Sequence, residues 1–271
     1  MTWNAEGMFV EGTKTRRATP HDALATLRHL DADIVVVPEF GRISTLKEEI
    51  RLSLESLGYE LTMLKYDEPR LPGLGFAILS RLKVVSSQVH NLHDSRRQVL
   101  EVRCKSLEGV VIRVLGIHLD DRSEKGRLNE IASVADIVNN NHDTPTLLLG
   151  DFNAMRRESL FATFARSSSA RGMIRRVNHE LVRSIAERVA EMAIGTTIEY
   201  LETHTKLHDM DRGMKRTISS KQDGLEWVPS WRLAKIDWIF GSKHFSTRSY
   251  HVLPDVGSDH RPVLATLDVV S

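Results

Sequence analysis

The sequence lacks the features that hold small secreted proteins together or carry a chain through a membrane. Cys104 is the single cysteine among 271 residues, so an internal disulfide is excluded and a thiolate zinc cluster has no ligands. No apolar run approaches the roughly 18 residues that span a bilayer. The first residues have neither the basic nor the apolar region of a signal peptide. These absences predict a cytoplasmic protein with no transmembrane segment.

An excess of charge of one sign is also missing. The 37 Lys and Arg nearly balance the 36 Asp and Glu, unlike a protein whose basic charge coats DNA. The balance is uneven along the chain, because residues 156–221 hold 13 Lys and Arg against 8 Asp and Glu, whereas the rest holds 24 against 28. This basic segment is either a solvated helical face or a surface that steers a phosphate-bearing substrate. Composition alone does not separate the two.

Length and hydrophobic pattern predict one α/β domain over residues 1–271. A chain of this length buries enough apolar surface to fold without cross-links, and short apolar runs alternate with segments of helical spacing. The run 99–104 alternates with period two, as a strand with one solvent-facing side does. Strands are expected at 34–37, 61–64, 75–79, 84–89, 99–104, 110–117, 146–149, 236–240 and 262–269, and helices at about 20–30, 44–57 and 124–138.

Two of these helices carry local end signals. Thr19 is expected to cap a helix that starts at Pro20, with the acidic Asp22 at its third position. Gly58 stands where a left-handed C-terminal cap ends the helix predicted over 44–57.

Residues 156–222 break this rhythm and predict a mostly helical insertion. Apolar residues recur at spacings of three and four from Ile174 to Met192, as they do on an amphipathic helix. A free helix would expose this stripe, so we expect it to dock on the body of the protein or on a second copy of the chain. Arg171, Arg175 and Arg176 lie in the most basic part of the insertion.

Polar residues gather where the predicted strands end, the positions at which an α/β scaffold presents functional groups. Each alone is ambiguous, because a lone Asp usually caps a turn and a lone His is usually structural. Asp237 differs, since it is embedded in an apolar run where an unpaired carboxylate is costly. It needs a partner, and histidine is a candidate. The set comprises Asn4, Glu39, His118, Asp151, Asn153, Asp237, Asp259 and His260.

In this order the set resembles the endonuclease/exonuclease/phosphatase superfamily, the DNase I-like metal-dependent phosphoesterases. The matching segments follow the family order over nearly the whole chain. They are Thr2-Trp3-Asn4-Ala5-Glu6-Gly7, Val37-Pro38-Glu39, Gly75-Phe76-Ala77-Ile78-Leu79-Ser80-Arg81, Gly116-Ile117-His118-Leu119, Gly150-Asp151-Phe152-Asn153, Lys235-Ile236-Asp237-Trp238-Ile239-Phe240 and Ser258-Asp259-His260-Arg261-Pro262-Val263. The most specific are the Gly-Asp-Phe-Asn segment at 150–153 and the Ser-Asp-His-Arg-Pro-Val segment at 258–263.

The resemblance implies an α/β fold, a two-sheet sandwich with helices on the outer faces and an active site at one end of the paired sheets. It implies that Glu39 binds Mg²⁺ or Mn²⁺, supported by Asn4, and that Asp259 completes the environment of this metal or of a second one. Such oxygen ligands suit these hard cations.

The resemblance also implies roles for the remaining residues of the set. Asp151 would orient or deprotonate the attacking water, and Asn153 would help to position that water and the phosphate. Asp237 would orient His260 and keep its imidazole protonated. His118 and His260 would donate hydrogen bonds to the phosphoryl oxygens as negative charge builds.

The activity implied is hydrolysis of a phosphodiester, with nucleic acid as the leading substrate. The alternatives are a phosphoinositide, a sphingolipid or another small phosphoester, and, in a different class, a binding module on the same fold that has lost turnover. The basic insertion, with Arg171, Arg175 and Arg176, is expected to form one wall of the substrate groove, with a structural cap away from the groove as the alternative.

Overall fold

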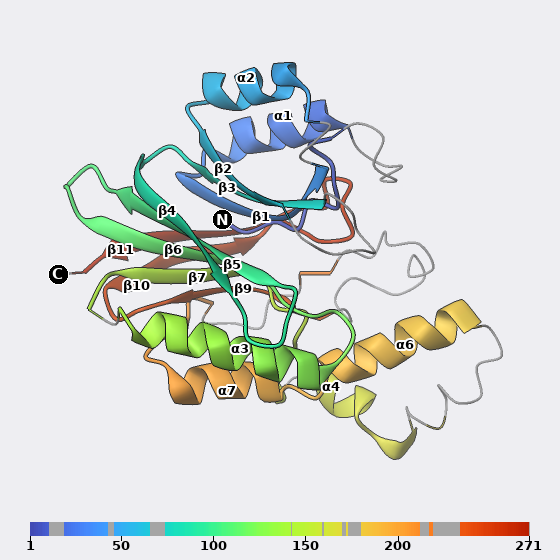
Figure 1. Ribbon diagram of the computed structural model, residues 1–271. Helices are drawn as coiled ribbons and strands as arrows, with labels where there is room; N and C mark the ends of the chain where they lie inside the picture. Colours follow the sequence, from blue (N-terminus) through green and yellow to red (C-terminus); the bar gives the residue numbers. More distant parts are fainter. Residues whose placement is uncertain are drawn as a thin grey trace.

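The computed structural model describes residues 1–10, 19–42, 46–65, 74–141, 143–158, 160–169, 172, 180–211, 217–218 and 234–270. Two β-sheets pack face to face, and helices cover their outer sides (Figure 1). The predicted α/β sandwich is therefore confirmed. No helix in the described ranges is long and apolar enough to cross a membrane.

The first sheet joins the two ends of the chain. It contains β1 (Ile34–Arg42), β2 (Glu60–Lys65) and β3 (Leu74–Ser80) in the antiparallel order β1-β3-β2, and the antiparallel pair β10 (Phe245–Val252) and β11 (Val263–Val269). Thr2 links these two groups, because it bridges Val36 on one side and Val263 on the other. The residues next to Thr2 are thus fixed between β1 and β11.

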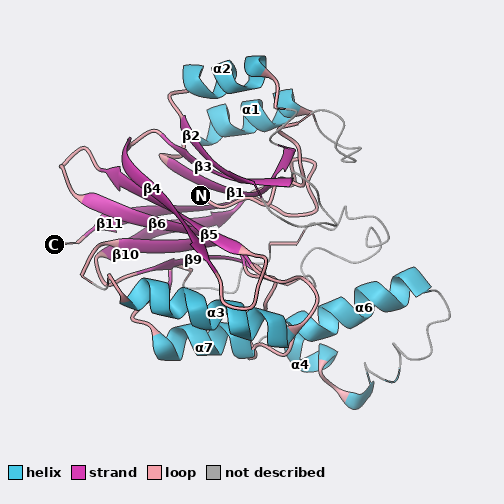
Figure 2. Ribbon diagram, viewed as in Figure 1, coloured by secondary structure: helices cyan, strands magenta, loops and turns pink. Residues whose placement is uncertain are grey.

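The second sheet has the order β4-β5-β6-β7-β9-β8 among the described strands. Figure 2 shows the strands in magenta and the helices that cover them in cyan. Its strands are β4 (Lys83–Asn91), β5 (Gln98–Lys105), β6 (Val111–His118), β7 (Thr146–Asp151), β8 (His208–Asp209) and β9 (Asp237–Gly241). Only the β6–β7 pair is parallel within this described sheet. The crossover between them carries helix α3 (Glu124–Asn139), as a parallel pair requires.

Apolar side chains from the facing sides of both sheets form the central core. Val36 and Ile78 of the first sheet pack with Val102, Val114 and Leu149 of the second, all buried. This core fixes the distance between the sheets and therefore the position of the strand ends that carry the polar residues.

Helices cover the outer face of each sheet. Helices α1 (Pro20–Leu30) and α2 (Glu48–Ser56) pack on the first sheet, and α3 and α7 (Thr196–His204) pack on the second. Thr19 and Asp22 form the predicted capping box, and Gly58 has the expected left-handed backbone, with a φ of +85°.

The predicted solvent-facing side of the strand 99–104 is only partly open, because Arg103 is partly exposed whereas Val99 and Glu101 on the same face are buried. Glu101 lies buried beneath α3, where its Oε2 accepts a hydrogen bond from Nη2 of Arg113 at 2.8 Å. The same guanidinium donates to the carbonyl of Ile137 in α3. A charged residue is buried here because its charge is paired.

The described part of the range 156–222 is mainly helical, with α4 (Leu160–Ala165), α6 (Glu180–Met192) and α7. Val189 and Met192 of the predicted apolar stripe pack against a small cluster that includes Met155 and Ile236 of the body. The first part of the stripe, from Ile174 through residue 179, lies outside the described residues.

Candidate active site

Three polar residues form a row across neighbouring strands of the second sheet. His118 at the end of β6 is the register partner of Asp151 at the end of β7, and Asp151 in turn faces Asp237 at the start of β9. Gly150 permits the close approach of β7 to β6, since a side-chain carbon there would lie 1.9 Å from the carbonyl oxygen of Ile117. Register partners project to the same face of a sheet, so the row collects its side chains at one end of the sandwich.

Glu39 reaches this end from the first sheet through a bulge in β1. The register of β1 with β3 shifts between Val37 and Gly41, and Glu39 has a φ of 49°, which is uncommon for a residue other than glycine. Bulges re-aim side chains beside functional sites. Here the amide of Gly7 donates to the carbonyl of Glu39 at 2.6 Å and holds the turned backbone.

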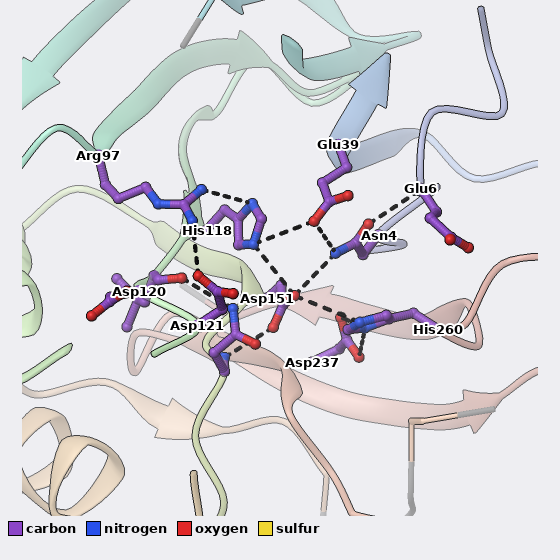
Figure 3. A network of polar contacts seen from close by, with 12 residues as sticks. Asn4, Glu6, Glu39, Arg97, His118, Asp120, Asp121, Asp151, Asp237 and His260 are labelled. Carbon is purple, nitrogen blue, oxygen red and sulfur yellow. Dashed lines mark hydrogen bonds and ion pairs between the residues drawn. The ribbon is translucent and has the colours of Figure 1, made fainter. Parts of the chain in front are cut away.

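Asn4 links the two sheets at the site (Figure 3). Its Nδ2 donates to Oδ2 of Asp151 at 3.0 Å and to Oε1 of Glu39 at 3.3 Å, while its Oδ1 accepts from the amide of Glu6 at 3.1 Å. One amide therefore holds the Glu39 and Asp151 carboxylates together.

The loop before β11 supplies Asp259 and His260. The hydroxyl of Ser258 donates to the carbonyl of Asn4 at 2.7 Å and accepts from the amide of His260 at 3.1 Å. The amide of Asp259 donates to Oε2 of Glu6 at 3.3 Å. These bonds fasten the loop to the N-terminal residues, so both ends of the chain build the site.

His260 is paired with Asp237, as the burial of Asp237 requires. Nδ1 of His260 donates to Oδ2 of Asp237 at 2.9 Å, and its Nε2 lies 3.8 Å from Oδ2 of Asp151 and 3.9 Å from Oδ1 of Asp259. Burial opposes the charge of the imidazole, but the surrounding Asp237, Asp259 and Asp151 carboxylates raise the pKa of His260 well above its usual value. His260 is therefore a cation at neutral pH.

His118 has the opposite electrostatic setting. Its Nε2 lies 3.7 Å from both Oε1 of Glu39 and Oδ2 of Asp151, and its Nδ1 lies 3.4 Å from Nη1 of Arg97. Burial, and then the positive charge of Arg97, hold the pKa of His118 well below its usual value. The site thus contains one charged and one neutral histidine.

The carboxylates are crowded enough to favour a cation. Burial raises the pKa of Glu39 to about 7, and the charges of Asp259 and Asp151 act in the same direction. Burial also raises the pKa of Asp151 to about 6, with the charge of Asp237 adding to the effect. The Glu39 side chain is 27% exposed, which gives an ion access. Oxygen donors in this setting fit a hard divalent cation.

A second grouping is less suited to a metal. Asp151, Asp237 and His260 place one potential ligand atom each within 4.8 Å of one another. Asp237 and Nδ1 of His260 already satisfy each other, and the charged His260 would repel a cation. We therefore favour Glu39 and Asp259 as the metal-binding side of the site, with Asn4 as the residue that orients the Glu39 carboxylate through its Nδ2.

The eight polar residues predicted from the sequence meet at this end of the sandwich. Asn153 lies beside the row, where its amide N–H donates to Oδ1 of Asp151 at 2.9 Å and its Nδ2 donates to the carbonyl of Leu119 at 3.0 Å. Arg171, Arg175 and Arg176 lie outside the described residues.

Sequence reasoning missed Arg97, Asp121 and Ser258. Arg97 and Asp121 stand in polar loops whose composition is ordinary for a surface connection. Ser258 belongs to one of the family-like segments, and its place directly before Asp259 was the available signal.

A two-sheet α/β sandwich that holds carboxylates, an amide and two histidines at one end is the fold of a phosphoesterase family. The chain belongs to the Endonuclease/Exonuclease/phosphatase family, whose profile matches residues 1–260. Members of this family are hydrolases, with nucleases and phosphatases among them. No curated protein matches the sequence significantly.

Solved structures share the fold at low sequence identity. An endonuclease/exonuclease/phosphatase family protein from Bacteroides thetaiotaomicron has a TM-score of 0.68 and 17% identity, over 100% of this chain and 96% of its own. A mannosyl-6-phosphatase from Bacteroides thetaiotaomicron VPI-5482 has a TM-score of 0.66 and 17% identity, over 98% of both chains. The human Nocturnin catalytic domain with bound sulfate has a TM-score of 0.62 and 17% identity, over 99% of this chain and 93% of its own.

Proposed function

We propose that this protein is a divalent-metal-dependent phosphoesterase that hydrolyses a phosphodiester by attack of water on phosphorus. The observation that carries the proposal is the convergence of two unlike histidines on one carboxylate. Nε2 of His118 and Nε2 of His260 lie 3.7 and 3.8 Å from Oδ2 of Asp151. Phosphoryl transfer needs positioned donors around the phosphate and a base for the nucleophile, and this arrangement provides both.

Asp151 is the group we assign to the water. The amide of Asn153 fixes Oδ1 of Asp151, which leaves Oδ2 facing the two histidines. A pKa raised to about 6 keeps this carboxyl ionised at neutral pH and still basic enough to take a proton. His118 and His260 donate to the phosphoryl oxygens, and Asp237 holds the imidazole of His260 in position.

Glu39 and Asp259 would hold Mg²⁺ or Mn²⁺, and Asn4 would support the site by orienting the Glu39 carboxylate through its Nδ2. A cation bound there would supply positive charge for the phosphoryl oxygens. Burial first, and then the charge of Asp259, raise the pKa of Glu39, and a cation bound at these carboxylates would offset both effects.

The basic insertion favours a polymeric diester over a small monoester. Residues 156–221 hold 13 Lys and Arg against 8 Asp and Glu, and a basic segment beside the site would attract a polyanion. We therefore propose nucleic acid as the diester. The mannosyl-6-phosphatase of the same fold keeps a small phosphomonoester as the alternative.

Turnover of matched substrates tests the proposal. Bis-p-nitrophenyl phosphate, p-nitrophenyl phosphate, inositol phosphates, and DNA and RNA oligonucleotides should be compared with Mg²⁺, with Mn²⁺ and after EDTA. We expect the diesters to be hydrolysed fastest, activity to vanish with EDTA, and Mg²⁺ or Mn²⁺ to restore it. Asp151→Asn should be inactive, and Asp136→Asn on the exposed side of α3 is the matched control.

Three outcomes would overturn parts of the proposal. Full activity after exhaustive chelation would exclude the metal. Binding of oligonucleotides without turnover of any substrate would support the binding-module alternative. Faster hydrolysis of p-nitrophenyl phosphate than of the diester would assign the protein to the phosphomonoesterases.

A further inference from the structure

Arg97 contacts the site but belongs to none of its strands. It stands in the loop between β4 and β5, buried beside His118, where its Nη1 lies 3.4 Å from Nδ1 of the imidazole. Its Nη2 lies 3.6 Å from Oδ1 of Asp121 in the loop that follows β6 (Figure 3). The guanidinium is thus placed between the histidine and a carboxylate.

The loop that carries Arg97 is fastened to the scaffold. The amide of Arg97 donates to the hydroxyl of Ser95 at 2.9 Å, and that hydroxyl donates to Oε1 of the buried Glu130 in α3 at 2.5 Å. The other carboxylate oxygen of Glu130 accepts from the amide of Asp120 at 2.7 Å. Both loops that meet at Arg97 are therefore held by the same helix, so the contact with His118 is positioned from two sides.

The guanidinium of Arg97 determines which ring nitrogen of His118 carries the proton. An arginine side chain has five N–H donors, no acceptor, and does not lose its proton in proteins. Nδ1 of His118 must therefore present its lone pair to Arg97, and the single proton of the neutral ring must lie on Nε2. The partner of His260 acts in the opposite way, because the Asp237 carboxylate only accepts and requires a proton on Nδ1.

We propose that Arg97 is a positioning residue that holds Nδ1 of His118 as an acceptor and so keeps the ring proton on Nε2, aimed at the phosphoryl oxygen. Nε2 is the atom that lies 3.7 Å from both Glu39 and Asp151, so the N–H points into the space between these carboxylates. With the other tautomer, the Nε2 lone pair would face the phosphate and repel it. The effect of Arg97 on rate rests on the proposed phosphoesterase function, whereas the tautomer does not.

Nitrogen-15 NMR of the histidine rings, recorded on the full chain with and without Mg²⁺, measures the tautomer directly. The two-bond couplings of a neutral ring distinguish a protonated Nε2 from a protonated Nδ1, and His118→Ala identifies the signal. We expect the wild type to hold its proton on Nε2. Arg97→Gln, which can donate or accept, should yield a mixture of tautomers. Arg97→Lys, which can only donate, and the exposed neighbour Arg96→Gln should keep the wild-type pattern.

A double-mutant cycle on bis-p-nitrophenyl phosphate measures the consequence for turnover. Arg97→Gln should lower kcat by up to about 10²-fold, the low end of the loss seen when one transition-state donor is removed, with KM nearly unchanged. In the His118→Ala background the same substitution should cost nothing further, because the two residues act as a unit. Arg97→Lys should recover most of the loss.

The two readouts separate the failure of this proposal from the failure of the proposed function. A proton on Nδ1 of His118 in the wild type overturns the role of Arg97, even if Arg97→Gln does not fold. The role of Arg97 is also overturned if the fold-losses in kcat of Arg97→Gln and His118→Ala multiply in the double variant. If the wild type hydrolyses no phosphate ester, the proposed function fails, and the NMR result still decides the tautomer.

Discussion

The two histidines of the site differ in charge because their partners differ. Asp237 accepts a hydrogen bond from His260 at 2.9 Å and stabilises the imidazolium, whereas burial and Arg97 keep His118 neutral. A phosphate bound as we propose would meet a charged donor on one side and a neutral donor on the other.

Removing the charged donor should slow turnover strongly. His260→Ala is expected to lower kcat at least ~10²-fold, because a transition-state donor is lost. Asp237→Asn should leave the fold intact but allow the wrong tautomer of His260. The double variant should be little slower than His260→Ala alone. Rates on bis-p-nitrophenyl phosphate measure all three.

The exposed pair His93 and Asp94 provides a matched control. Their side chains approach to 3.0 Å at the surface, so Asp94→Asn should leave the rate unchanged. Losses for Asp237 and His260 that add in log rate would show that the buried pair does not act as a unit.

Among single residues, the sequence predicted those whose burial requires a charged or polar partner. Asp237 lay in an apolar run and needed a partner, which the structure supplies as His260. Arg97 created no such demand in the sequence, because a charged residue in a polar loop is ordinary. Its contact with His118 arises only when the loop between β4 and β5 folds over the end of β6.

Elements with local signals were predictable, and elements with distant partners were not. Strand β10 was missed because its register shifts between Thr247 and Ser249, so Phe245 and Tyr250 share the core face at an odd spacing. Helix α7 lies within the predicted helical insertion, but its start could not be predicted because its N-cap is Gly195, without a side-chain cap. The amide of Thr197 instead donates to Oε1 of Glu124 in α3 at 2.8 Å.

The helical insertion lies beside the site in its described part. Nη1 of Arg188 in α6 lies 3.4 Å from Oδ2 of Asp121, the residue that also contacts Arg97. This contact supports the prediction that the insertion forms a wall of the substrate groove.

Neutralising Arg171, Arg175 and Arg176 together should raise KM on an oligonucleotide and flatten its salt dependence. Each lost phosphate contact lowers the slope of log affinity against log salt by about 0.7–0.9. Turnover of bis-p-nitrophenyl phosphate should stay nearly unchanged, because this small diester does not reach a groove wall. Kinetics over a salt series measure both effects.

A triple variant that loses the same charge elsewhere controls for the overall electrostatic field of the protein. Arg28, Lys83 and Arg248 are exposed on other elements, and neutralising them removes the same charge. If both triple variants keep wild-type kinetics on the oligonucleotide, the insertion is not a substrate wall.

At the scale of the whole molecule, the acidic site couples stability to pH and to metal. Burial raises the pKa of Glu39 to about 7 and of Asp151 to about 6, above the ordinary values of about 4 in an unfolded chain. Between about pH 4 and pH 7, the folded chain therefore keeps protons on Glu39 and Asp151 that the unfolded chain has already released. These two groups favour folding as the pH falls through this window, and they oppose it once they are ionised above pH ~7.

Magnesium should restore the folding stability that is lost at high pH. A cation competes with the protons, so Mg²⁺ should raise Tm more at about pH 8 than at about pH 5.5. At about 100 times its Kd, a ligand adds about 2.7 kcal/mol, which corresponds to about 5–10 °C for a chain of this size. Thermal unfolding of the wild type and of Glu39→Gln measures the effect. An equal Mg²⁺ shift in Glu39→Gln would place the cation elsewhere.

The register row of His118, Asp151 and Asp237 also limits where the length of the chain can change. These residues face one another on three adjacent strands, and a shift of one residue in β7 would turn Asp151 to the opposite face of the sheet. Deletions or insertions within these strands would therefore dismantle the site. The connection from β7 to β9 can change length only between its anchors, because the amide of Asn153 holds Asp151 at one end and the hydroxyl of Thr217 accepts from the amide of Asp237 near the other. A segment grafted between these anchors, outside β8, would therefore change the surroundings of the row while leaving its three residues in register.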